Sequence, residues 1–174
     1  MARESLIRAG EQAPEFALPA SDNSVWSLQH LLRGERVLLV FYGRDGRACR
    51  TLLPFVERMQ RRLHRAGLRV AGVAQDSHPD TLELADAFQI TFPLLLDHPR
   101  FALTRAYGVV QVPTQVWISK AGEVLGTLIG FSRTAQDQLF LRLARELGQP
   151  ETGLFERGDL VPDSAEPSPS ASVG

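Results

Sequence analysis

The sequence is poor in cysteine. Cys49 is the only one among 174 residues, so the chain cannot form an intramolecular disulfide. A protein without a cysteine pair suits a reducing compartment, and the cytoplasm is the expected location. The four histidines are scattered and lack metal-ligand spacing, which argues against a zinc site.

Long apolar runs and excess charge are missing as well. No stretch reaches the length of a transmembrane helix, and the first 16 residues lack the apolar core of a signal peptide, so we expect no membrane association. The net charge of −1 gives no electrostatic reason to expect nucleic-acid binding. With no Walker loop and no Gly-x-Gly-x-x-Gly pattern, we expect no nucleotide cofactor or other cofactor. A chain with 44% hydrophobic and 22% charged residues suits one globular domain.

Strand and helix patterns alternate through the first 148 residues. Residues 36–42 and 68–74 are apolar, β-branched runs that suit strands buried on both faces. Residues 47–65 carry apolar side chains at spacings of three and four, which predicts a helix, with a kink at Pro54. Shorter elements are expected as a strand and helical turn over 25–32, a helix over 79–88, a strand over 93–96, a helix over 100–107, a hairpin of strands over 114–119 and 123–131, and a helix over 134–147. This order predicts an α/β fold with parallel central strands, helices on both faces and an antiparallel hairpin at the edge.

The composition changes after residue 148. Residues 149–174 contain four prolines, four serines, five acidic residues and one arginine. Such a segment buries too little apolar surface to fold alone. We therefore predict a domain over residues 1–148 and a disordered acidic tail over residues 149–174.

The cysteine lies in the stretch FYGRDGRACRTLLP, residues 41–54. An apolar strand enters a turn rich in glycine and arginine, and Cys49 follows in the first turn of the predicted helix. Unpaired amides and the positive end of the helix dipole stabilise an anion there, and Arg44, Arg47 and Arg50 add positive charge. These features favour a reactive thiolate. Burial behind the turn would instead raise the thiol pKa and leave a small buried apolar residue, and the sequence leaves both interpretations open.

Three segments resemble thioredoxin-like redoxins of the alkyl hydroperoxide reductase/thiol-specific antioxidant group and the TlpA-like thiol-disulfide reductases. They are GEQAPEFALP, VLLVFYGRDGRACRTLLP and FPLLLDHPRFALTRAYGVVQVPTQVWISKAGEV. With the matching order of strands and helices, the resemblance covers roughly residues 10–147. It implies a thioredoxin-like fold, with a central mixed sheet and helices on both faces in a single domain. It also implies that Pro113 is cis and that Val112 and Pro113 face the active-site turn.

The resemblance breaks at the active site. TlpA-like reductases carry Cys-x-x-Cys, in which the first sulfur attacks and the second resolves the mixed disulfide. Here the turn reads GRAC, so Gly46 stands at the first position and Cys49 at the second. Against the peroxiredoxin motif Pro-x-x-x-Thr-x-x-Cys-x-x-Glu, only the cysteine is kept, and Tyr42, Gly46 and Leu52 replace the other residues. Neither dithiol cycling nor fast peroxide reduction is expected from such a site.

The resulting prediction is a cytoplasmic single-thiol oxidoreductase, or a weak antioxidant peroxidase. Cys49 would be the nucleophile, with Arg47 and Arg50 beside it, and an external thiol such as glutathione or a thioredoxin would resolve it. The residues predicted to contact the partner are Tyr42, Gly46, Ala48, Val112 and Pro113.

Two alternatives stay open. The first is a catalytically silent redoxin fold that binds a client polypeptide in the cis-proline groove. In either case the chain is expected to be a monomer or a homodimer. A weaker option is a regulatory thiol that forms a Cys49–Cys49 link between two chains. Near the turn, Asp45 is either a polar turn residue or a proton shuttle. Asp76 and Asp97 are expected to end strands at the same edge of the sheet, as solvated carboxylates.

Overall fold

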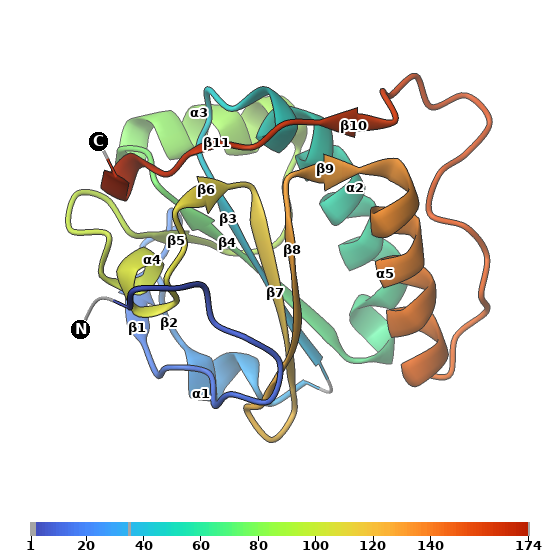
Figure 1. Ribbon diagram of the computed structural model, residues 1–174, viewed down its shortest axis with the longest axis horizontal. Helices are drawn as coiled ribbons and strands as arrows, with labels where there is room; N and C mark the ends of the chain where they lie inside the picture. Colours follow the sequence, from blue (N-terminus) through green and yellow to red (C-terminus); the bar gives the residue numbers. More distant parts are fainter. Residues whose placement is uncertain (1–2, 35, 174) are drawn as a thin grey trace.

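The computed structural model describes residues 3–34 and 36–173, and residues 1, 2, 35 and 174 of the predicted domain and tail lie outside the described residues. A five-stranded sheet with the order β5-β4-β3-β7-β8 forms the centre (Figure 1). Strands β3, β4 and β5 are parallel to one another, and β7 is antiparallel to both of its neighbours. The sheet is therefore mixed, and the predicted thioredoxin-like architecture is confirmed.

The elements follow the predicted order. The strands of the central sheet are β3 (Arg36–Tyr42), β4 (Leu68–Ala74), β5 (Leu94–Leu96), β7 (Thr114–Ser119) and β8 (Val124–Ile129). The helices are α1 (Leu28–Leu31), α2 (Arg47–Leu63), α3 (His78–Phe88), α4 (Ala102–Ala106) and α5 (Arg133–Glu146), with 3-10 turns η1 (His64–Ala66) and η2 (Ala171–Val173). Short antiparallel pairs are β1 (Ala17–Pro19) with β2 (Val25–Ser27), β6 (Gln111–Val112) with β11 (Ser168–Pro169), and β9 (Phe131–Ser132) with β10 (Ser164–Ala165).

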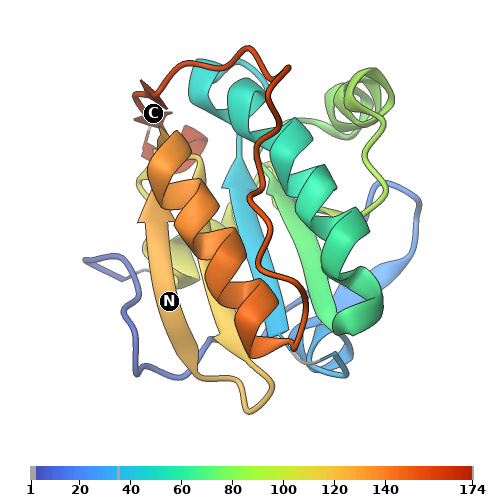
Figure 2. The same cartoon turned by 90° about the vertical axis from the view of Figure 1, so that its right-hand side faces the viewer.

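The core is built on β3. Every residue from Val37 to Tyr42 is fully buried, because β4 and β7 pair with both edges of β3 and helices cover both faces of the sheet. Helices α2 and α5 lie side by side on one face, and α4 lies on the other (Figure 2). Throughout residues 3–34 and 36–173, no helix is long and apolar enough to cross a bilayer.

The tail differs from the prediction of disorder. Its described residues run between α2 and α5 and then along one end of the sheet (Figures 1 and 2). Leu154 is fully buried, and the Phe155 ring lies 4.7 Å from the ring of Phe55. Arg58 on α2 donates to both carboxylate oxygens of Asp159, at 2.6 and 3.1 Å.

The tail folds because it contributes to a core that already exists. Two neighbouring apolar residues fill the space between the helices, and tail carboxylates pair with arginines of α2. The average composition of the tail does not reveal two such anchoring residues, since it indicates only whether the segment could fold alone.

Candidate functional site

Three segments meet at the carboxyl ends of β3 and β4. They are the turn of residues 43–46 after β3, the pair Gln75 and Asp76 after β4, and the segment before β7 that contains Val112. The Val112–Pro113 peptide bond is cis, as the resemblance implied. A Cβ placed on Gly43 would lie 3.9 Å from Cγ2 of Val112, so the turn and this segment face each other across a narrow space.

Cys49 lies in the first turn of α2, as predicted, but its side chain is fully buried. Burial raises the pKa of the thiol to about 12. Backbone hydrogen bonding at Gly43 and at Cys49 itself lowers the pKa less, and the charge of Asp76 raises it further. The thiol is therefore protonated at neutral pH, and of the two interpretations that the sequence left open, the structure agrees with the buried thiol of raised pKa.

The arginines expected to assist the thiol point elsewhere. The Arg50 guanidinium lies over the ring of Phe88, 5.3 Å from its centroid, and Arg47 is exposed. Arg44 forms an ion pair with a carboxylate of α3 at 2.6 Å. The guanidinium groups of Arg44 and Arg50 are therefore engaged with α3 rather than with the thiol, whose raised pKa follows from burial.

The predicted partner-binding residues divide into two groups. All five are buried, but Gly46 and Val112 line a cavity of about 230 Å³, and Pro113 follows Val112. Tyr42 and Ala48 are 0% exposed beneath the turn and do not line this cavity. They were misassigned because the sequence shows which residues flank the turn but not which of them the turn covers.

The carboxylate beside the thiol is Asp76 rather than Asp45. The Asp45 side chain is 99% exposed, whereas Asp76 is partly buried and accepts a hydrogen bond from the Arg44 amide at 2.9 Å. Burial raises the pKa of Asp76. Burial also raises the pKa of the Tyr42 hydroxyl, and the charge of Asp76 raises it further. That hydroxyl has no hydrogen-bond partner among the described residues.

Gln75 is a site residue that the sequence analysis missed. Its Nε2 donates to Ser170 Oγ at 2.7 Å and to Thr104 Oγ1 at 3.3 Å, while its Oε1 accepts from the Ala171 amide at 2.9 Å. Thr104 donates to Asp97 at 2.6 Å, so Asp97 is a buried positioning residue and not the solvated strand end that was expected. The position of Gln75 directly after β4, at the edge where α/β sites form, was the available signal.

The end of the tail completes the site. β11 pairs with β6 in an antiparallel register that places Ser168 opposite Val112 and Pro169 opposite Gln111. The Ser170 amide extends this pairing by donating to the Val110 carbonyl at 2.9 Å. The tail therefore forms one wall of the 230 Å³ cavity.

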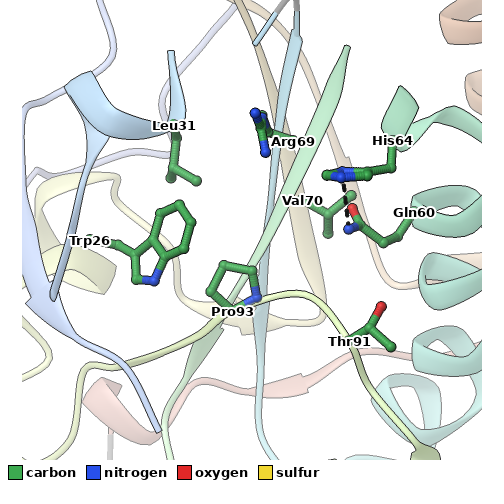
Figure 3. Close-up of a pocket in the computed structure, with 8 residues that line it drawn as sticks. All are labelled: Trp26, Leu31, Gln60, His64, Arg69, Val70, Thr91 and Pro93. Atoms are coloured by element: carbon green, nitrogen blue, oxygen red, sulfur yellow. Dashed lines mark hydrogen bonds between the residues drawn. The ribbon is translucent and has the colours of Figure 1, made fainter. Parts of the chain in front are cut away.

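A second cavity, of about 350 Å³, lies near the start of β4. It is bounded by Trp26, Gln60, His64, Arg69 and Pro93 (Figure 3). The side chains of Gln60 and His64 approach each other at 3.5 Å on one wall, and Trp26 stands on another. The six residue steps from Arg69 along β4 to Gln75 span about 20 Å, so this cavity is separate from the site around Cys49.

The comparisons with known proteins agree with the fold. The sequence model of the AhpC/TSA family matches residues 9–126. The chain is 30% identical over 132 residues to the thioredoxin-like protein YneN of Bacillus subtilis, covering 74% of this chain and 75% of that protein. It is 27% identical over 145 residues to the thiol-disulfide oxidoreductase ResA of Halalkalibacterium halodurans, covering 83% and 81%. The crystal structure of the hypothetical protein SMc02350 from Sinorhizobium meliloti 1021 has the same fold, with a TM-score of 0.75 at 14% identity, covering 98% of this chain and 97% of that one.

Proposed function

This chain belongs to the AhpC/TSA family, and we propose that it binds an extended polypeptide at the β6 edge and does not use Cys49 as a nucleophile. The observation that carries the proposal is a contrast within one site. The edge before Pro113 already pairs with an extended strand, while the thiol behind it is buried and has a raised pKa.

The state of the thiol argues against catalysis. Attack on a disulfide or a peroxide requires a thiolate and access to it. A pKa of about 12 leaves on the order of one thiol in 10⁴ to 10⁵ ionised at neutral pH. Gly46, at the place of the missing first cysteine, brings no second sulfur to resolve a mixed disulfide.

The geometry of the edge argues for binding. A strand edge presents backbone amides and carbonyls in a row, and an extended chain adds to it by main-chain hydrogen bonds. Relatives named thiol-disulfide oxidoreductases act on thiols and disulfides. In this chain the same end of the fold keeps the strand-binding edge and has lost the attacking sulfur, so we expect client polypeptides to be held there.

The second candidate is the single-thiol oxidoreductase, with glutathione or a thioredoxin as the resolving partner. The 230 Å³ cavity favours it, because this cavity reaches Gly43 and Gly46 directly above Cys49, with Asp76 in its wall as a proton acceptor. Either activity suits a reducing compartment such as the cytoplasm.

The experiment compares the natural protein with Cys49→Ser. Reduced, carboxymethylated α-lactalbumin serves as an unfolded polypeptide without free thiols, and backbone NMR signals of residues 110–112 report binding. We expect both proteins to show the same shifts and neither to reduce peroxide or disulfides with glutathione. Turnover that Cys49→Ser abolishes would support the second candidate. Because β11 already occupies the β6 edge, the probe is added at concentrations that compete with an intramolecular strand, and an absence of shifts in both proteins under those conditions would refute strand binding.

A further inference from the structure

We propose that residues 166–173 are a built-in ligand of the β6 edge, and that this edge selects an extended segment with a small hydroxyl side chain, read by Gln75. The inference rests on the proposed function and names the class of polypeptide that the edge takes. Its natural occupant is the chain's own Ser-Pro-Ser-Ala segment, residues 168–171.

The backbone pairing explains where proline is tolerated. Hydrogen-bonded and non-hydrogen-bonded residue pairs alternate along an antiparallel ladder. Ser170 donates to Val110, which makes this a hydrogen-bonded pair, so Pro169 opposite Gln111 falls in the other class. Proline has no amide hydrogen to donate, and this position does not need one. The segment is therefore matched to the register of β6.

The side-chain contacts supply selectivity. Thr104 donates its hydroxyl hydrogen to Asp97, so its oxygen is left to accept from Gln75 Nε2. This fixes the amide of Gln75 in one orientation. The amide then donates to the Ser170 hydroxyl with Nε2 and accepts the next backbone amide, that of Ala171, with Oε1.

The pocket around the hydroxyl is small and closed. Ser170 is 1% exposed, and its Oγ also contacts Ser172 Oγ at 2.9 Å. A larger side chain would have to displace these neighbours. An apolar side chain would leave one of the two Nε2 hydrogens of the buried Gln75 without an acceptor, since only the bond to Thr104 would remain. Serine is the residue that suits this position.

The tail is attached at several places before it reaches the site. Phe155 and Asp159 contact α2, the Leu154 amide donates to Asp137 on α5, and β10 pairs with β9. The last eight described residues add no large buried apolar side chain, and Val173 is 56% exposed. They are therefore held mainly by hydrogen bonds, and they can leave the edge while the anchor stays, which would open the cavity above the turn.

The test uses the full chain with Ala171→Pro, which removes the amide that donates to Gln75. Leu160→Ser is the control, because Leu160 lies in the same tail and is 99% exposed. We expect Ala171→Pro to shift the NMR signals of residues 110–112 and of the Gln75 amide, with the signals of residues 154–159 unchanged. The control should change neither set.

A synthetic peptide with the sequence of residues 164–173 should then bind Ala171→Pro at least about tenfold more tightly than the natural protein, since its own segment no longer competes. The same peptide with Ser170→Val should bind weakly or not at all. Equal binding of the two peptides, or none by either, would overturn the inference. If the lactalbumin probe still binds in that case, the proposed function stands alone, and if it also fails, both fall.

Discussion

A cysteine introduced at Gly46 tests the assignment of the turn. A Cβ placed on Gly46 would lie 3.0 Å from Sγ of Cys49 and 3.5 Å from its Cβ. The Cβ atoms of a disulfide lie roughly 3.5–4.5 Å apart. Gly46 has φ −70° and ψ 120°, an extended conformation that any L-residue adopts. Gly46→Cys should therefore close a disulfide with Cys49 without movement of the backbone.

The size of the effect follows from the short loop. In the chain-entropy treatment, a bond that closes four residues stabilises the folded state by about 2 kcal/mol. For a domain of this length, the oxidised variant should melt roughly 4–8 °C above its reduced form. In the reduced form the 3.0 Å approach is a close nonbonded contact, which formation of the bond would relieve.

The assay is mass spectrometry for the loss of two hydrogens after treatment with diamide, together with thermal melts with and without reductant. Gly43→Cys is the matched control. It puts a second thiol into the same turn, but within 4 Å its Cβ would meet only Val112 and no atom of Cys49. If Gly46→Cys kept two free thiols while Gly43→Cys became crosslinked, the assignment of Gly46 to the first position of the motif would be refuted.

Three further predictions concern the thiol, the tail and the sheet. Since the pKa of Cys49 is raised to about 12, its alkylation rate should climb about tenfold per pH unit from pH 7 to 10. The rate should lie on the order of 10³ below that of the urea-unfolded chain at pH 7–8 and about 10² below it at pH 10, where the unfolded thiol is already ionised; a plateau near pH 8 would contradict the burial. The Arg58 guanidinium lowers the pKa of Asp159 to about 2. The stability that this ion pair gives the tail is therefore fully present above about pH 4 and is lost as the pH falls toward 2. Amide exchange in the tail should show this loss in the natural protein, and Asp159→Asn should show no such pH dependence. Gly126→Ala would place a Cβ 2.3 Å from the Trp117 ring and should lower the free energy of unfolding by about 1–3 kcal/mol in urea titration, whereas Gly158→Ala, with open space around it, should leave this energy nearly unchanged.

The central strands were predictable because their side chains are apolar on both faces and can pack against any apolar layer that covers them. Residues 36–42 and 68–74 were assigned from apolar runs alone, and the structure places β3 and β4 over the same residues. Such runs suit any sheet whose two faces are both covered. They could therefore be assigned as strands without knowing which helices cover the sheet.

The site was harder to predict because it depends on contacts between distant segments. The position of Cys49 at a helix start follows from local sequence, but its pKa depends on the turn and on Asp76 above it. The role of Gln75 appears only when Ser170, which lies 95 residues away, is brought beside it. A periodicity of three or four residues carries no information about such a pairing.

The two strands of the β6–β11 pair are synthesised at different times, because β6 lies well before β11 in the sequence. Fifty-six residues separate Val112 from Ser168, and translation adds about 5–20 residues per second. For roughly 3–11 seconds a growing chain therefore contains the residues of β6 but not yet those of β11, which cover them in the folded protein. During that interval another extended chain meets no competition from residues 168 and 169 for the β6 residues.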